Sequence, residues 1–214
     1  PEAVGDFSHV LADGKIFADG STFAKIARDA KMKRTDEGFA LLRKFGGFPE
    51  PFLRGEEAFH RRWQKDYKTL IAREEVRDLS QIQDIRGVEV LIEVLPTKIG
   101  SPLSIKSLGD DLAYNHRTIA RWIDILCALY LVFMLRPWHR KITRAIRKEP
   151  KLYFYDWSLL TDEGNRFENM IAVSLSRMAA RFTEQGLGDY EIRYIRDREK
   201  REVNFILVKD NHPL

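Results

Sequence analysis

The chain has 214 residues, of which 44% are hydrophobic and 32% charged, a balance that excludes a disordered segment and indicates a folded protein with a charged surface. Its 36 Lys and Arg residues against 32 Asp and Glu give a formal charge of +4, which permits binding to an anionic polymer without requiring it. A single cysteine, Cys127, excludes an intrachain disulfide and a cysteine-rich zinc site. The sequence shows neither a secretory signal nor an apolar run of the roughly 18 residues that a membrane span needs, so we expect a cytoplasmic protein.

The first third of the chain carries the weakest patterns. Residues 21–30 and 36–44 show short helical patterns, and residues 46–51 combine two glycines with two prolines, which predicts a loop or a domain boundary. Apolar residues at helical spacing in 56–72 predict an amphipathic helix whose basic side chains face solvent. The chain does not start with methionine and stops just after an apolar run, and we therefore expect a fragment of a longer protein.

Residues 104–130 have the pattern of a helix-turn-helix, preceded by a further predicted helix at 85–95. Ser104 is a suitable N-cap for the first of the two helices, and Asn115 for the second. The apolar face of the second helix contains Trp122, which we expect in the core. Its polar side near the start is basic, as in a helix that enters the major groove of DNA.

Two strands are predicted next, at 131–135 and 151–155, and a strongly basic segment separates them. Between residues 136 and 151 there are seven Lys or Arg against one acid, Glu149. Helices followed by a long hairpin predict a winged helix with the basic segment as its wing. We expect the aromatic residues 153–155 of the returning strand in the core.

This arrangement favours DNA binding, mainly through the phosphate contacts that dominate affinity. We expect the contacts with double-stranded DNA to come from the start of the second helix and from the wing: His116, Arg117, Arg121, Arg140, Lys141, Arg144 and Arg147. The same kind of domain also serves in other proteins as a spacer or a protein-docking module. A docking or oligomerisation module is therefore the alternative.

The last quarter of the chain predicts a helix followed by two strands. Apolar residues line one face of residues 164–182, and Gly186 and Gly188 end this helix. Residues 191–195 and 203–208 then alternate as strands do. The fold class that we expect is α+β, with a mainly helical N-terminal part, a winged helix-turn-helix and a small α/β region at the end.

Several strings of the chain resemble a bacterial and archaeal family of predicted AAA-type (P-loop) ATPases. They are GGFPEPFLR from Gly46, FHRRW from Phe59, SPLSIKSLGDDL from Ser101, HRTIARWIDIL from His116 and EPKLYFYDWSLL from Glu149. In that family a P-loop ATPase domain is followed by a winged helix and then by a region similar to the PD-(D/E)XK nucleases. The resemblance covers nearly everything after Phe45.

The resemblance implies four segments in this chain. Residues 1–44 would be the tail of the ATPase region or a linker, and 45–79 a loop and an amphipathic helix. Residues 80–160 would form the winged helix, and 161–214 a partial nuclease-like domain. No G-x-x-x-x-G-K-[ST] run occurs, so nothing here would cradle the phosphates of ATP, and ATP and Mg²⁺ are implied only for the parent protein.

The resemblance also implies where nuclease-like residues would lie. The family pattern E-V-D-F stands here as Glu202-Val203-Asn204-Phe205, with an amide in place of the carboxylate that would bind a metal, and no E-x-K motif follows. Glu168, Glu202 and Asn204 are therefore interpreted as a vestigial nuclease-like group. We expect no catalytic residue, no bound metal and no enzyme activity from this chain, and a metal-dependent nuclease is the alternative hypothesis.

Overall fold

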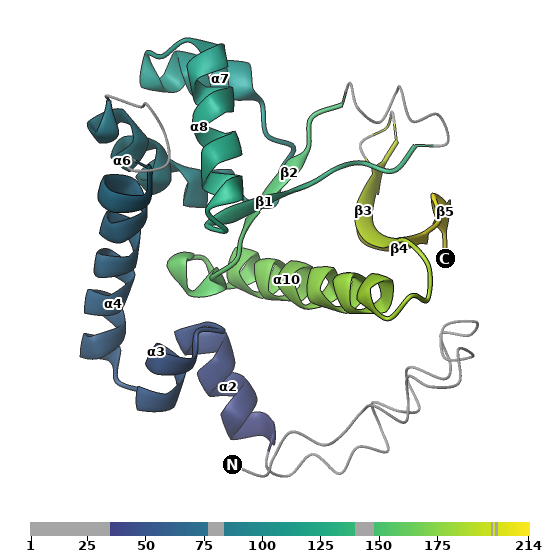
Figure 1. Ribbon diagram of the computed structural model, residues 1–214, viewed down its shortest axis with the longest axis horizontal. Coiled ribbons are helices and arrows are strands. Elements are labelled where there is room, and N and C mark those ends of the chain that lie inside the picture. Colours follow the sequence, from purple (N-terminus) through teal and green to yellow (C-terminus); the bar gives the residue numbers. More distant parts are fainter. Residues whose placement is uncertain (1–34, 77–83, 140–147, 198, 200) are drawn as a thin grey trace.

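The computed structural model describes residues 35–76, 84–139, 148–197, 199 and 201–214. The helical pattern expected at 21–30 lies outside these residues. The described chain combines helices with a two-stranded and a three-stranded antiparallel sheet, which confirms the α+β class. Figure 1 shows the N-terminal helices on one side, the two-stranded hairpin in the middle and the three-stranded sheet at the other end, with helix α10 running between them.

The N-terminal part consists of α2 (Thr35–Phe45), α3 (Pro49–Arg54) and α4 (Glu57–Leu70), and the π-helical turn η1 (Ile71–Glu75) continues α4. Gly46 turns the chain after α2 with a φ of 83°, as a loop prediction requires. The prediction that the prolines also break helical structure was wrong, because α3 begins at Pro49. Pro49 and Pro51 occupy its first turn, where backbone N–H groups lack an intrahelical acceptor in any case.

Residues 84–155 form a unit that we call the helix-hairpin unit. It contains α6 (Ile85–Val94), the 3-10 turn η2 (Leu95–Lys98), α7 (Ile105–Leu112), α8 (His116–Ala128) and the strands β1 (Val132–Leu135) and β2 (Lys151–Phe154). Ser104 caps α7 and Asn115 caps α8 through their side-chain oxygens, as predicted. Ala113 ends α7 in a left-handed conformation, so that α7 and α8 are joined by a tight turn.

The hairpin of this unit is antiparallel, with Val132 opposite Phe154 and Leu135 opposite Lys151. An isolated antiparallel bridge between Pro102 and Lys151 adds the segment before α7 to the other edge of β2. Both predicted strands are confirmed, and the segment between them includes residues 140–147, which lie outside the described part.

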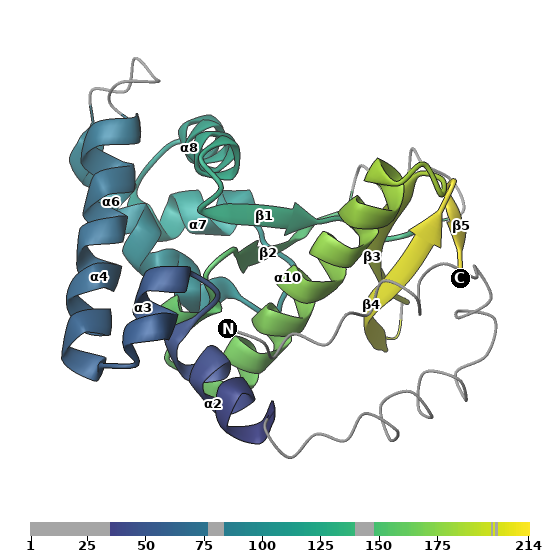
Figure 2. The same ribbon diagram turned by 60° about the horizontal axis from the view of Figure 1, so that its bottom comes forward.

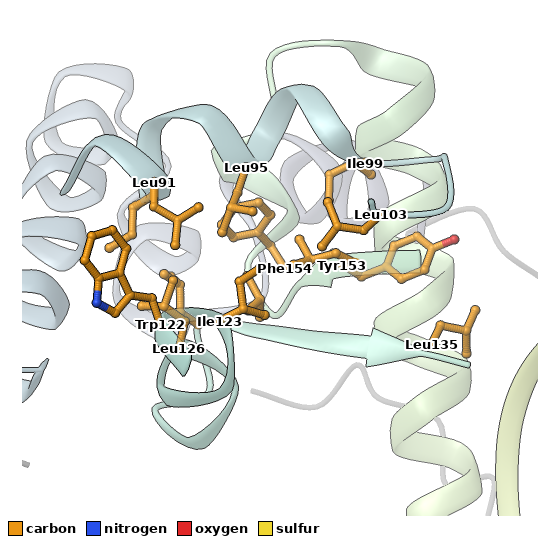
Figure 3. Close-up of a cluster of buried hydrophobic side chains, with 14 of the residues drawn as sticks. Leu91, Leu95, Ile99, Leu103, Trp122, Ile123, Leu126, Leu135, Tyr153 and Phe154 are labelled. Carbon is orange, nitrogen blue, oxygen red and sulfur yellow. The ribbon is translucent and has the colours of Figure 1, made fainter. Parts of the chain in front are cut away.

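The core lies where α6, α8 and the hairpin meet. Figure 3 shows apolar side chains gathered there from these elements and from residues 95–103, which follow α6. Trp122 and Tyr153 are buried there as predicted, and the labelled residues of the figure are Leu91, Leu95, Ile99, Leu103, Trp122, Ile123, Leu126, Leu135, Tyr153 and Phe154. This packing fixes α8 with its apolar face inward, which leaves its opposite face to solvent.

The C-terminal part begins with the 3-10 turn η3 (Trp157–Leu159) and the long helix α10 (Glu163–Glu184). Strands β3 (Tyr190–Arg196), β4 (Glu202–Lys209) and β5 (His212–Pro213) follow and pair in the order β3-β4-β5. Figure 2 shows α10 lying diagonally between the hairpin and this sheet. The strand predicted at 203–208 pairs along its length with β3, and β5 pairs only with its end, at Val208 and Lys209.

Backbone contacts join the hairpin to the C-terminal sheet just beyond β1. Pro137 forms a parallel bridge with Tyr194 of β3. The Trp138 N–H donates to the Tyr194 carbonyl at 2.7 Å, and the Tyr194 N–H donates to the Arg136 carbonyl at 3.3 Å. The residues directly after β1, which form the first stem of the basic segment between β1 and β2, are therefore held by β3.

Candidate functional site

Glu168, Glu202 and Asn204 meet around the buried ammonium group of Lys151. Lys151 is the first residue of β2 and is fully buried. Its Nζ atom lies 2.5 Å from Oε1 of Glu202, 3.5 Å from Oε1 of Glu168 and 3.4 Å from Oδ1 of Asn204. The three residues that the resemblance groups together thus come together in space.

Three separate elements supply this group. Lys151 comes from the hairpin, Glu168 from the early part of α10, and Glu202 and Asn204 from β4. The two glutamate side chains are 21% and 18% exposed, so one end of the group reaches solvent. This group is therefore one of the places where the hairpin, α10 and the C-terminal sheet are connected.

Further polar contacts orient the two carboxylates. The Tyr153 hydroxyl donates to Oε1 of Glu168 at 2.7 Å, and Nδ2 of Asn204 donates to Oε2 of the same residue at 3.2 Å. Nη1 of Arg196 lies 3.7 Å from Oε2 of Glu202. We call these six residues the lysine cluster: Lys151, Tyr153, Glu168, Arg196, Glu202 and Asn204.

The phenols at the cluster are neutral hydrogen-bond donors. Burial is the main cause that raises the pKa of Tyr153 far above its ordinary value, and the hydrogen bond to Glu168 adds to it. Burial likewise raises the pKa of Tyr194 to about 12. The Tyr194 ring also faces the Lys151 ammonium, with 5.7 Å between Nζ and the ring centroid, a distance at which a cation is attracted to an aromatic face.

The role of Lys151 was not predicted from the sequence, in which this residue counts among the basic residues of the wing. The structure corrects this, because Lys151 is buried and paired rather than exposed. A weak signal was present: residues i and i+2 of a strand share a face, so Lys151 lies on the same face as the core residue Tyr153. Within the described ranges, no three His, Cys, Asp or Glu side chains are grouped so that they could hold a metal ion.

The start of α8 carries the predicted DNA-contacting residues that the structure describes. His116, Arg117 and Arg121 are all exposed, on the side of α8 opposite the buried Ile119, Trp122 and Ile123. Among the described residues, the side chains of these three have no hydrogen bond or ion pair. Within the described part of the chain, the charges of Arg117 and Arg121 are therefore not compensated by a carboxylate.

The other predicted contacts, Arg140, Lys141, Arg144 and Arg147, lie outside the described residues. The stems on either side of them are described and are held by the C-terminal sheet. The first stem is bridged to Tyr194 at Pro137, and on the second stem the Tyr194 hydroxyl donates to the Glu149 carbonyl at 2.5 Å. Tyr194 therefore contacts both stems of the basic segment.

A buried polar network that the sequence pattern does not predict joins α4 to η3. Nε2 of His60 lies 2.9 Å from Oγ of Ser158, and the Ser158 hydroxyl donates to Oδ2 of Asp156 at 2.8 Å. Gln64 donates to the Ser158 carbonyl at 2.7 Å. Since the hydroxyl proton of Ser158 is used on Asp156, His60 must donate to Ser158, and the serine is not activated as a nucleophile.

The chain matches a known protein family over most of its length. A family model described as a domain of unknown function (DUF8612) matches residues 37–165, which is more than half of the chain. The protein belongs to the DUF8612 family. The DUF8612 segment contains the helix-hairpin unit with Lys151, and it ends before Glu168 of α10 and before the C-terminal sheet.

One relative outside this domain comparison is an archaeal protein. The uncharacterized protein MJ1544 of Methanocaldococcus jannaschii is 28% identical over 182 residues, which covers 80% of this chain and 39% of the relative. The DUF8612 chain thus spans well under half the length of that protein. No solved structure matches the DUF8612 chain significantly. In the described part of the chain, no helix combines the length and apolar character that crossing a bilayer requires.

Proposed function

We propose that this chain binds double-stranded DNA through the helix-hairpin unit, as a non-catalytic region of a larger P-loop ATPase. The arrangement that supports the proposal is the order of its elements: a first helix, two helices joined by a tight turn, and an antiparallel hairpin whose edge is extended at Pro102. This is the order found in winged helices. In such domains the second helix of the turn enters the major groove.

The observation that carries the proposal is the exposed, unpaired basic start of α8. Two other cations in this part of the chain pair with carboxylates: Lys98 lies 2.9 Å from Asp111, and Arg73, in the turn η1 before the unit, lies 2.5 Å from Glu89. Arg117 and Arg121 have no such carboxylate among the described residues. Unpaired arginine side chains of this kind can neutralise phosphates and thereby release the counterions that surround DNA, which favours binding.

The wing is the second part of the proposed interface. Seven Lys or Arg residues between positions 136 and 151 include Lys151, which is buried and makes no contribution to a surface. The remaining six residues give the segment a strong positive charge, and its stems are held by Tyr194. We propose that Arg140, Lys141, Arg144 and Arg147 add phosphate contacts beside those of α8.

The larger ATPase in the proposal rests on the family resemblance of the sequence strings and on the length of the archaeal relative. That relative has ample length for further domains, since the chain covers 39% of it. ATP and Mg²⁺ belong in this proposal to the parent protein, whose ATPase domain would be the intramolecular partner of this region.

The test is binding to a fluorescently labelled DNA duplex at low salt. We compare the wild type with Arg117→Ala/Arg121→Ala and with Arg61→Ala/Arg62→Ala, which removes the same charge from the exposed side of α4. We expect the affinity of the α8 variant for the duplex to be at least roughly ten-fold lower than that of the wild type. The affinity of the α4 control should lie within about two-fold of the wild type. Equal losses in both variants would reduce the effect to net charge, and absence of wild-type binding would favour a protein-docking module.

The meeting of Glu168, Glu202 and Asn204 supports a second candidate, a metal-dependent nuclease-like region. Phosphodiester cleavage of this class needs carboxylates that hold a divalent cation. Mg²⁺- or Mn²⁺-stimulated cleavage of DNA that is lost in Glu168→Gln would establish this function. Cleavage that persists in Glu168→Gln, or that is absent from the wild type, would remove it.

A further inference from the structure

The lysine cluster brings together three oxygen ligands of the kind that can hold a divalent cation. Carboxylates of Glu168 and Glu202 and the amide oxygen of Asn204 converge on one point from two elements. Hard cations such as Mg²⁺ and Mn²⁺ prefer such oxygens. At this point, however, the fully buried ammonium group of Lys151 is present.

The charges of the cluster are balanced without a metal ion. Lys151 and Arg196 supply two positive charges, and Glu168 and Glu202 supply two negative charges. A buried ion pair needs this balance, because an uncompensated charge away from water is costly. A dication added to the present cluster would give it an excess of two positive charges.

The two ends of the Asn204 side chain fit this balance. Its Oδ1 accepts from Lys151 at 3.4 Å, while its Nδ2 donates to Glu168 at 3.2 Å. A carboxylate at this position would lack the donor and would repel Glu168. The amide is therefore matched to a cluster whose cation carries a single charge.

We propose that the Lys151 ammonium is the permanent cation of the lysine cluster and closes a latent divalent-metal site formed by Glu168, Glu202 and Asn204. The lysine comes from the hairpin, and the oxygen ligands come from α10 and β4. The ion pairs of this cation therefore also connect the hairpin to α10 and to the C-terminal sheet. When the lysine side chain is removed, a divalent metal ion from solution can bind to the oxygens of Glu168, Glu202 and Asn204. The nitrogen–oxygen distances of 2.5 to 3.5 Å require the oxygens to move inward by roughly 0.4 to 1.4 Å to reach metal–oxygen distances.

The experiment is a titration of Mn²⁺ followed by the electron paramagnetic resonance signal of the free ion. Three proteins are compared: the wild type, Lys151→Ala, and Lys98→Ala as a control that removes a surface lysine paired with Asp111. We expect Lys151→Ala to take up one Mn²⁺ per chain below about 1 mM, and the wild type and the control to show no saturable uptake. Adding Glu202→Gln to Lys151→Ala should abolish the uptake.

The remaining outcomes are equally decisive. Saturable Mn²⁺ uptake by the wild type overturns the proposal, and so does a folded Lys151→Ala that takes up no Mn²⁺. If Lys151→Ala is unfolded in metal-free buffer, its circular dichroism is followed as Mn²⁺ is added, since a ligand that binds only the folded state promotes folding. Recovery of the folded spectrum supports the proposal, and an unfolded spectrum that persists at about 10 mM Mn²⁺ overturns it. The proposal does not depend on DNA binding, so either can fail alone.

Discussion

Nε2 of His60 lies 2.9 Å from Oγ of Ser158, and this buried hydrogen bond joins helix α4 to a turn 98 residues later in the chain. Asp156 completes the network by accepting from both the hydroxyl and the N–H of Ser158. Gly46 packs directly against it: a Cβ atom added there would lie 2.2 Å from Oδ1 of Asp156. The N-terminal helices are thus attached to the rest of the fold through a polar contact as well as through apolar packing.

The first prediction concerns the pH dependence of stability through Asp156. Burial raises the pKa of this carboxyl group to about 6 although Ser158 hydrogen bonds lower it. Because the folded-state pKa lies above the unfolded value, the folded state binds the proton more tightly. The protonated Asp156 carboxyl group therefore stabilises the folded state fully at pH values below the unfolded pKa. Roughly 3 kcal/mol of the free energy of unfolding is lost as pH rises from there to about 6.

Asp156→Asn should remove this loss, because an amide does not ionise. Urea unfolding at a series of pH values between about 4 and 7 measures the difference between the two proteins. His60 works in the opposite direction, since burial lowers its pKa and stability is lost as pH falls through that value. Parallel pH profiles for wild type and variant would contradict the assignment to Asp156.

The second prediction is that Gly87→Ala disrupts the packing of α6 on α8. A Cβ atom added at Gly87 would lie 2.5 Å from Cη2 of Trp122 and 2.6 Å from the Tyr114 hydroxyl oxygen. Both rings are packed against each other, so we expect a loss of about 1–3 kcal/mol in the free energy of unfolding. Gly38→Ala in α2 is the control, because its Cβ would meet nothing within 4 Å. It should be neutral or stabilising by up to about 1 kcal/mol.

The third prediction is that Glu202→Gln strongly destabilises the protein. The variant removes the carboxylate nearest to the buried Lys151 ammonium and leaves a buried charge undercompensated, which costs about 3–5 kcal/mol. Glu163→Gln is the matched change in an exposed pair, with Arg43 at 2.8 Å, and should cost at most about 1 kcal/mol. Chemical unfolding of both variants checks the difference, and similar losses would speak against a buried charge pair at Lys151.

The fourth prediction concerns the stems of the basic segment. Tyr194→Phe removes the hydroxyl that donates to the Glu149 carbonyl and should cost about 1 kcal/mol of stability. If the wing contacts DNA, the loosened stem should also weaken duplex binding by a few-fold. Tyr190→Phe is the control, because the Tyr190 hydroxyl donates no hydrogen bond within the described residues. Unchanged DNA affinity in Tyr194→Phe would show that the stem does not position a DNA contact.

Local signals in the sequence were sufficient for most elements of the fold. Ser104 and Asn115 were predicted as caps and act as caps, because capping depends on neighbours only two or three residues away. The prediction at Pro49 and Pro51 was wrong since the rule that proline breaks helices does not hold in the first turn.

The candidate sites were predicted unevenly for a physical reason. The exposed basic residues of α8 follow from helical spacing alone. The burial of Lys151 does not, because it depends on α10 and β4 closing over one face of β2, and charge alone indicates an exposed residue. The network of His60 with Ser158 was missed for the same reason, since only the tertiary fold brings the two together.

The salt dependence of DNA binding tests the proposed function most directly. Each phosphate contact contributes about 0.9 to the slope of log affinity against log salt concentration. If Arg117 and Arg121 each contact a phosphate, the slope for Arg117→Ala/Arg121→Ala should be smaller than that of the wild type by about 2. A wild-type slope near zero, or an unchanged slope in the variant, would contradict DNA binding through the start of α8.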